Sequence, residues 1–333
     1  MNINWKNISG HEENIAQLQQ LLQEDRLPHA LLFYGLRGVG KFLTARVLAA
    51  ALLCGKKEAC GTCPSCREFM AETHPDFFVL EPEGKMIRMI KIEQIRKLQT
   101  AIAKRPYRSE RQVVIIDQAD AMNEAAANCL LKTLEEPQGQ TVFILLAEKK
   151  DALLDTIVSR SMLVPFQPLA RALLREMLEK QGADKAAAGT IASLAAGSFG
   201  RALELLQPEI MEKRQDALRF FAKLPELSLE EVWKESQRLG AFSRDDVQEF
   251  FSWQNMLFRD LLVFKGNCQV EDLYNPDQAE LFQELLAAWS LPAIFLAMEA
   301  VKNLQKRLAS NANVKLLIEQ FLLKIRDIEE EAL

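Results

Sequence analysis

The first 166 residues alternate short apolar runs with amphipathic stretches, and this alternation limits the possible folds more than any other feature of the sequence. The apolar runs lie at 29–34, 77–80, 113–116, 141–146 and 162–164. Each is as short as a strand and apolar on both faces, which is typical of a parallel sheet buried between two layers of helices. Helical patterns such as 45–53 and 125–134 lie between the runs. The alternation predicts a doubly wound α/β domain over residues 1–167.

The strand-like runs stop after Pro168. Amphipathic patterns at 170–181, 185–196 and 200–206 predict short helices, and glycines 182 and 197 stand where glycine commonly ends a helix. From Glu209 onward the pattern predicts long helices, with prolines 276 and 292 at their boundaries. We therefore expect a small helical domain at 168–208 and a larger one at 209–333, which gives a fold of class α/β plus all-α.

Composition narrows the class of protein further. Hydrophobic residues make up 49% of the chain and charged residues 26%, which is ordinary for a soluble globular protein. No apolar run is long enough to span a bilayer, and the N-terminus lacks a basic region followed by an apolar stretch. The sequence therefore predicts a cytoplasmic protein without a membrane segment or a secretory signal.

The segment that follows the first predicted strand, Gly35-Leu36-Arg37-Gly38-Val39-Gly40-Lys41, matches the pattern G-x-x-x-x-G-K. The backbone N–H groups of such a loop bind phosphates at a helix N-terminus. We expect Gly35, Gly38, Gly40 and Lys41 to form a nucleotide-binding loop, and the alternative is a plain strand-to-helix turn. The next residue is Phe42, where a Ser or Thr hydroxyl would normally bind Mg²⁺. The loop could therefore hold ATP or ADP without turning it over.

The predicted strand at 113–116 ends in Asp117, which fits the position of a Mg²⁺-holding carboxylate. The alternative is that Asp117 only caps the turn that follows it. In ATPases of this layout a Glu usually comes next and orients the attacking water, whereas here Gln118 follows, and an amide cannot accept a proton as a carboxylate does. Phe42 and Gln118 together predict little or no intrinsic ATP hydrolysis.

Four of the six cysteines lie within 13 residues, as Cys54, Cys60, Cys63 and Cys66. Thiolates at two-residue spacing can converge on one tetrahedral ion, and Gly61 and Pro64 supply the turns for such a knuckle. An iron–sulfur cluster is the competing interpretation, but the downstream Cys-Pro of the ferredoxin pattern is missing. We predict a structural Zn²⁺ site at these four cysteines, and we expect the isolated Cys129 and Cys268 to be core residues.

The segment from Lys85 to Arg111 carries nine basic residues against two acidic ones, although the whole chain has a net charge of −5. Such a basic helix could follow the phosphates of DNA, and the candidate contacts are Lys97, Lys104, Arg105 and Arg108. The alternative is a solvated charged face without a partner.

Several of these segments, with others, occur in the same order in one known family. The shared segments are 27–30, the loop at 35–41, the four-cysteine segment, 74–76, 128–137, 156–161 and 311–314. They are spread over essentially the whole chain, and the run Leu130-Leu131-Lys132-Thr133-Leu134-Glu135-Glu136-Pro137 is highly specific. The chain resembles the bacterial clamp-loader subunits of the AAA+ superfamily, which belong to the DNA polymerase III holoenzyme.

Within this family the chain looks like the delta-prime branch rather than the ATP-hydrolysing gamma/tau branch. Phe42 and Gln118 are two departures from the gamma pattern, and Gly200 is the third, because gamma-like subunits carry the sensor-2 arginine there. Arg201 is one position away and would point in another direction from a helix.

The resemblance implies a hetero-pentamer with gamma/tau and delta subunits that opens a sliding clamp and closes it on primed DNA. It implies that residues 1–167 form the AAA+ domain with the cysteine module at 54–66 inserted, that 168–208 form a lid, and that 209–333 form an oligomerising collar. It further implies that Arg160, in Ser159-Arg160-Ser161, acts as an arginine finger on the ATP of a neighbouring gamma/tau subunit. A structural salt bridge is the alternative role of Arg160, and a gamma-type motor subunit is the alternative identity of the chain.

Overall fold

The computed structural model describes residues 3–84, 88–136, 139–266, 269–308 and 312–328. The chain packs as two compact units. The first unit comprises Met1–Leu174 with Gly197–Arg201, and the second comprises Arg175–Ala196 with Ala202–Leu333. The sequence predicted three domains, and the boundaries of those domains stay a prediction. The packing itself divides the chain into two units.

The first unit is built on a five-stranded parallel sheet with the strand order β2-β3-β4-β1-β5. All five predicted strands are present: β1 (Ala30–Gly35), β2 (Phe77–Leu80), β3 (Gln112–Ile116), β4 (Thr141–Ala147) and β5 (Met162–Phe166). The central strands are apolar on both sides because helices cover both faces. Strands β3 and β4 are completely buried, which explains why their sequences are continuous apolar runs.

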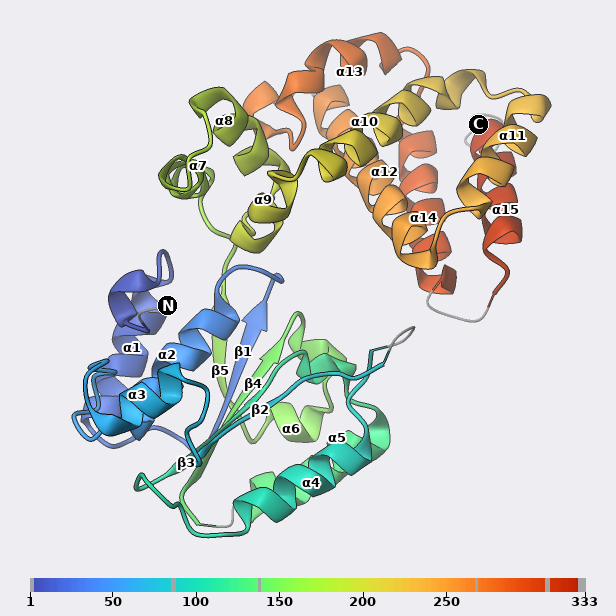
Figure 1. Cartoon of the computed structure of the whole chain (residues 1–333). Helices are drawn as coiled ribbons and strands as arrows, with labels where there is room; N and C mark the ends of the chain where they lie inside the picture. The colour runs from blue at the N-terminus through green and yellow to red at the C-terminus, as the bar shows by residue number, and fades with distance from the viewer. Residues whose placement is uncertain (1–2, 85–87, 137–138, 267–268, 309–311, 329–333) are drawn as a thin grey trace. The chain divides into compact units, whose positions relative to one another are not determined.

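Six helices form the two layers around the sheet (Figure 1). Helices α1 (Glu12–Gln23), α2 (Lys41–Leu53) and α3 (Pro64–Met70) cover one face, and α4 (Ile92–Ile102), α5 (Glu124–Glu135) and α6 (Asp155–Val158) cover the other. Along β1, Leu31 and Phe33 pack into the first layer, whereas Ala30 and Leu32 pack into the second. The period of two residues follows from the pleat of the strand. The predicted fold class is confirmed.

The remaining helices follow the sheet in sequence, and the structure confirms that no strand follows β5 in the described part of the chain. They are α7 (Arg171–Lys180), α8 (Lys185–Leu194), α9 (Phe199–Leu205), α10 (Pro208–Lys223), α11 (Leu229–Gly240), α12 (Arg244–Lys265), α13 (Ala279–Leu285), α14 (Leu291–Leu308) and α15 (Val314–Arg326). Helix α13 is shorter than the sequence led us to expect. Gly182 and Gly197, predicted to end helices, both have positive φ angles, of 94° and 90°.

Aromatic contacts and a buried polar network contribute to the packing of the second unit. Helix α12 packs against α10, α13 and α14, with Phe258 edge-on to Phe221 at 4.9 Å and to Trp289 at 5.2 Å between ring centroids. Buried Arg214 of α10 donates to Asn275 and to both carboxylate oxygens of Asp277, at 2.7 and 2.8 Å. None of the described helices combines the length and the apolarity of a membrane-spanning segment.

Candidate functional site

The predicted nucleotide loop connects β1 to α2, at the edge of the sheet where the parallel strands end. Gly38 and Gly40 have φ angles of 77° and 111°, which residues with a side chain rarely adopt. Helix α2 begins at Lys41, which is 9% exposed. Its Nζ atom donates to the carbonyl oxygens of Gly35 at 2.5 Å and Leu36 at 2.8 Å. The loop therefore has the backbone shape of a phosphate-binding loop, with its lysine folded back onto it.

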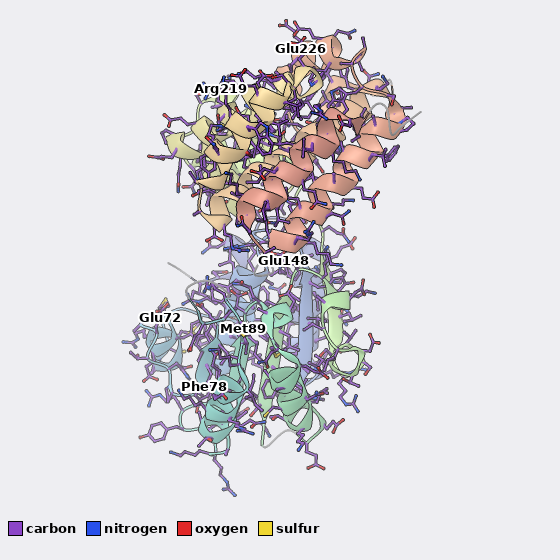
Figure 2. The ribbon with its side chains drawn as sticks, turned by 90° about the vertical axis from the view of Figure 1, so that its right-hand side faces the viewer. Glu72, Phe78, Met89, Glu148, Arg219 and Glu226 are labelled. Carbon is purple, nitrogen blue, oxygen red and sulfur yellow. The ribbon has the colours of Figure 1, made fainter. Side chains whose placement is uncertain are left out.

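Acidic side chains that follow β3 and β4 act electrostatically on this lysine. Burial lowers the pKa of Lys41, and the carboxylates of Glu148, Asp117 and Asp120 oppose that shift by stabilising its charged form. Glu148 is labelled in Figure 2, just after β4. The Asp117 carboxylate therefore acts on the Lys41 ammonium, while the nucleotide-binding role of the two residues stays a prediction.

Two positions that serve Mg²⁺ and water in active ATPases of this layout are occupied by Phe42 and Gln118. The Phe42 side chain is half-buried and packs against the core between the sheet and the first helical layer. Gln118 has a φ angle of 50°, in the left-handed region, and its N–H donates to Asp117 Oδ1 at 3.0 Å. Asp117 therefore makes the local turn contact that was its alternative role, while it also lies near Lys41.

The segment 197–201 packs directly on the nucleotide loop. Ser198 Oγ donates to the carbonyl oxygen of Arg37 at 2.7 Å, and the Gly200 N–H donates to the carbonyl oxygen of Gly38 at 2.9 Å. A Cβ atom added to Gly200 would lie 2.9 Å from Gly38 Cα, which is closer than van der Waals contact allows. The sequence identified Gly200 but missed Ser198, because nothing near residue 198 in the chain points to residue 37.

The four predicted metal ligands lie together. Their Sγ atoms are all within 4.8 Å of one another, and the Cys54–Cys60, Cys54–Cys63 and Cys60–Cys66 distances are 3.6, 3.9 and 3.9 Å. A tetrahedron with metal–sulfur bonds of about 2.3 Å has edges of about 3.8 Å. The cluster is therefore compatible with a structural metal site.

The local backbone explains this convergence. Gly61 has a φ angle of 71°, Pro64 is the first residue of α3, and the Cys63 side chain caps that helix. Hydrogen bonds from the Thr62 hydroxyl and from the backbone of Thr62 and Cys63 lower the pKa of Cys60 to about 5, whereas burial raises the pKa of Cys66.

The two remaining cysteines were expected to be core residues. Cys129 is half-buried and packs against the core of the α4–α5 layer, with its Sγ 3.5 Å from Gln99 Oε1. Cys268 lies outside the described residues.

Arg160 follows α6 and is 37% exposed at its side chain. Its guanidinium forms an ion pair with Glu135 at the end of α5, at 2.7 Å, and donates to the Thr156 carbonyl oxygen at 3.1 Å. Glu135 belongs to the family-specific run at 130–137. Two of the segments that carried the resemblance therefore meet at this arginine, whose side chain stays partly exposed.

The basic segment is helical only in part, which corrects the expectation of one continuous basic helix. Helix α4 carries Arg96 and Lys97, whereas Lys104, Arg105 and Arg108 lie in the connection from α4 to β3. Lys97 and these three residues are exposed, and Arg108 pairs with Glu68 at 3.0 Å. The helix ends at Ile102, and an irregular loop that begins at Ala103 and contains Pro106 follows it. Lys85 lies outside the described residues.

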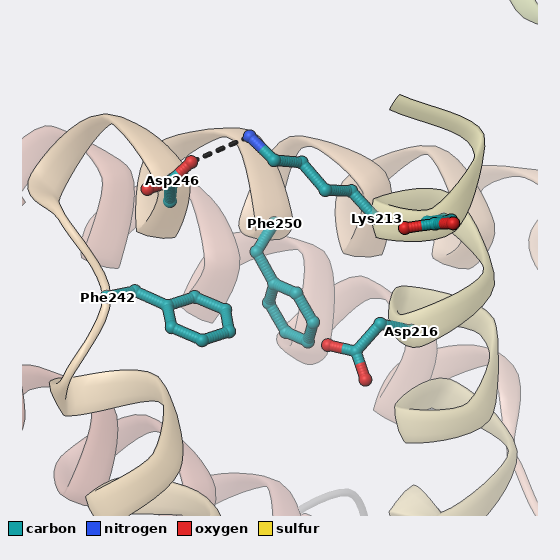
Figure 3. Close-up of a pocket in the computed structure, with 6 residues that line it drawn as sticks. Lys213, Asp216, Phe242, Asp246 and Phe250 are labelled. Atoms are coloured by element: carbon teal, nitrogen blue, oxygen red, sulfur yellow. Dashed lines mark hydrogen bonds and ion pairs between the residues drawn. The ribbon is translucent and has the colours of Figure 1, made fainter. Parts of the chain in front are cut away.

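The second unit contains a cavity of about 350 Å³ that the sequence did not predict (Figure 3). Phe242 and Phe250 line it, and Lys213 crosses its rim to Asp246 at 2.7 Å. No predicted site residue lines this cavity.

The chain was compared with known proteins. Residues 10–170 match the family model described as "DNA polymerase III, delta subunit", and residues 211–327 match "DNA polymerase III, delta subunit, C terminal". A DNA polymerase III subunit delta' of Bacillus subtilis is 31% identical over 98% of this chain and 100% of its own length. A subunit delta' of Pseudomonas aeruginosa is 45% identical over 40% of this chain and 41% of its own length.

A further relative is a gamma/tau subunit. A gamma/tau subunit of Mycobacterium tuberculosis is 33% identical over 53% of this chain and 31% of its own length. The delta' match extends over both units, whereas the gamma/tau match covers about half of the chain. The chain belongs to the family of DNA polymerase III delta-prime subunits.

Proposed function

We propose that this chain is a non-hydrolysing subunit of the replicative clamp loader and helps to load the sliding clamp onto primed DNA. The observation that carries the non-hydrolysing part is Phe42, whose half-buried ring packs against the core at the sequence position of the Mg²⁺ ligand. A metal held without that hydroxyl would lack one ligand of its usual set, and the charge developing on the γ-phosphate would be less stabilised.

Gln118 supports the same conclusion from a different element. It follows Asp117 at the end of β3, where the attacking water would be oriented, and an amide cannot accept a proton from that water. One well-placed electrostatic group is typically worth about 2.7–4 kcal/mol of barrier, so two independent losses remove most of the catalytic rate.

Nucleotide binding without turnover is a separate part of the proposal. Gly35, Gly38, Gly40 and Lys41 keep the shape of a phosphate-binding loop, and Asp117 lies near Lys41. ATP or ADP would have to draw Lys41 Nζ away from the carbonyl oxygens of Gly35 and Leu36. The segment 197–201 supplies no sensor-2 arginine at position 200 to help hold the γ-phosphate.

Arg160 carries the catalytic contribution that we propose. In the loader it would act in trans, as an arginine finger on the ATP of an adjoining gamma/tau subunit, where a guanidinium stabilises the charge that develops on the transferred phosphoryl group. Its partial exposure supports this role, since a finger must reach out of its own chain. The ion pair with Glu135 would orient the guanidinium before assembly.

We assign a structural Zn²⁺ to Cys54, Cys60, Cys63 and Cys66. Four thiolates fill a tetrahedral zinc site and leave no open position for catalysis, so this ion would only stabilise the module.

The partners in this proposal are gamma/tau and delta subunits, the sliding clamp and primed DNA, all in the cytoplasm. Residues 209–333, which are mostly helical in their described part, would contribute the collar of the hetero-pentamer. Lys97, Lys104, Arg105 and Arg108 are the proposed contacts to DNA, and their exposure supports that role.

Arg160→Ala in the reconstituted loader tests the finger. We expect the DNA-stimulated ATPase to lose the contribution of the adjoining site, because an arginine finger is worth about 10³-fold or more in turnover. Glu135→Gln is the matched control, since it breaks the same ion pair but keeps the guanidinium, and we expect it to retain activity within about threefold.

Two results would overturn the proposal. Equal losses in Arg160→Ala and Glu135→Gln would assign the arginine a structural role. ATP hydrolysis by the purified chain at the rate of a gamma subunit would instead identify it as a motor subunit.

A further inference from the structure

The connection from α4 to β3 presents one aromatic side chain to solvent. Tyr107 is 86% exposed, which makes it the most exposed large apolar side chain in the described part of the protein. Its neighbours in the chain are cationic, with Lys104 and Arg105 before it and Arg108 after it, and all three are exposed. An exposed tyrosine usually lies on a mobile loop, so the way in which this loop is held is informative.

A buried carboxylate fixes the backbone on which Tyr107 stands. Asp76, only 1% exposed, accepts hydrogen bonds from three consecutive N–H groups: Tyr107 at 2.6 Å, Arg108 at 2.7 Å and Ser109 at 2.8 Å. Hydrogen bonds to a charged acceptor are about twice as strong as those between neutral groups. The loop is therefore held at the base of the tyrosine.

A second layer of polar contacts ties the loop to the cysteine module. His74 is 4% exposed, and its Nδ1 accepts from the Asp76 N–H at 3.1 Å, so its Nε2 carries the proton. That Nε2 lies 2.9 Å from Ser65 Oγ and 3.4 Å from Ser109 Oγ. Both hydroxyls donate to the carbonyl oxygen of Leu53, the residue before Cys54.

These contacts fix the backbone of a residue, Tyr107, whose side chain hardly takes part in the packing of the fold. The Tyr107 ring contributes almost no buried area, yet three charge-assisted bonds and a buried histidine network hold its backbone in place. Ordering a loop costs conformational entropy, and a loop that is ordered before binding does not lose that entropy again when a ligand arrives. The construction is that of a preorganised binding element.

The chemistry of the surroundings favours nucleic acid over protein as the partner. Lys97, Lys104 and Arg105 have no ion-pair partner among the described residues, so their charges are free to meet phosphates. Protein interfaces centre on contiguous apolar cores, whereas Tyr107 is the only large apolar residue between positions 103 and 111. A single aromatic ring among unpaired cations is typical of proteins that stack an unpaired base and follow its backbone.

We propose that Tyr107 stacks on an unpaired base of single-stranded DNA while Lys104 and Arg105 contact the flanking phosphates. This inference rests on the proposed role of the chain at primed DNA. It adds Tyr107 as a contact residue and single-stranded DNA as the form that is bound. His74 and Asp76 are positioning residues for Tyr107, and the cysteine module supports them through Ser65.

The test is fluorescence anisotropy of the full chain with a fluorescein-labelled dT12 oligonucleotide. We expect Tyr107→Ala to weaken binding about 5- to 150-fold, because stacking is worth about 1–3 kcal/mol per base. Tyr107→Phe keeps the ring and should bind within about twofold of the wild type. The matched control is Trp233→Ala, which removes a half-exposed aromatic residue from the second unit and should have no effect.

The phosphate contacts have their own readout. Lys104→Ala with Arg105→Ala should reduce the slope of log affinity against log salt by about 1.4, since each phosphate contact to a single strand contributes about 0.7. Amide hydrogen exchange at residues 107–109 should rise in Asp76→Asn, which weakens the acceptor but keeps the ring.

Three outcomes would overturn the inference. They are no binding of dT12 by the wild type, equal binding by Tyr107→Ala and Trp233→Ala, or a Tyr107→Ala variant that binds dT12 normally but no longer binds the clamp. The last would make the loop a protein-docking element. None of them bears on Arg160, whose ATPase test reports separately on the proposed function.

Discussion

At Gly38 and Gly200 two backbone segments approach more closely than side chains would allow. The Gly200 N–H bonds the Gly38 carbonyl oxygen at 2.9 Å, and each position lacks the Cβ atom that would collide with the other segment. The φ angle of Gly38 is positive, but that of Gly200 is not, so space rather than backbone conformation requires glycine at position 200. This distinction makes Gly200 a clean probe of the contact.

We expect Gly200→Ala to destabilise the protein by about 1–3 kcal/mol, because its Cβ would lie 2.9 Å from Gly38 Cα and the backbone cannot move aside freely. Urea unfolding measures the change. Gly189→Ala in α8 is the control, since a Cβ there meets no atom within 4 Å, and a helical glycine replaced by alanine should gain about 0.5–1 kcal/mol. Equal effects of the two variants would contradict a tight contact at Gly200.

At the scale of elements, the sequence predicts the features that depend on residues close together in the chain. The buried strands are recognisable because both of their faces are apolar, and the cysteine module because its ligands are close in the chain. The contacts of Ser198 with residue 37 and of Asp76 with residues 107–109 could not be predicted. These contacts join segments that lie far apart in the sequence. A serine or an aspartate can also form several kinds of local hydrogen bond, and the sequence alone does not distinguish between them.

The cysteine module can be tested as an element. We expect the purified chain to hold about one zinc ion, and Cys60→Ser to lose the ion and lower the thermal unfolding midpoint, because metal binding to a structural site is part of the folding free energy. Metal analysis and calorimetry give the two readouts. Cys129→Ser should keep the ion, since Cys129 packs in another layer. A brown, iron-containing protein would contradict the zinc assignment.

At the scale of the molecule, charge and apolar surface are unevenly distributed. The chain carries a net charge of −5, although residues 85–111 alone contribute +7. In the second unit, Phe295 and Leu291 on α14 are 59% and 45% exposed, and Trp233 and Leu229 on α11 are 51% and 53% exposed. Apolar pairs one helical turn apart on an exposed face are typical of association surfaces.

Phe295→Asp tests whether the α14 surface takes part in assembly. Because the side chain is exposed, we expect the stability of the free chain to change by less than about 0.5 kcal/mol. Binding to gamma/tau and delta subunits should weaken tenfold or more, as for an aromatic hot spot, when followed by sedimentation velocity. Val270→Asp, at another exposed apolar position of the second unit, serves as the control. Unchanged assembly of the Phe295→Asp variant would exclude this surface.

The packing of segment 197–201 on the nucleotide loop also limits how this lineage can change. If the chain does not hydrolyse ATP, as we propose, a hydrolysing variant would need a hydroxyl at position 42, a carboxylate at 118 and an arginine at 200. The arginine is the hardest to introduce, because any side chain at position 200 must first displace the backbone of Gly38. A variant that carries the arginine would therefore lose stability at this contact. On our proposal that the chain does not hydrolyse ATP, the contact between residues 38 and 200 would therefore hinder a return to hydrolysis.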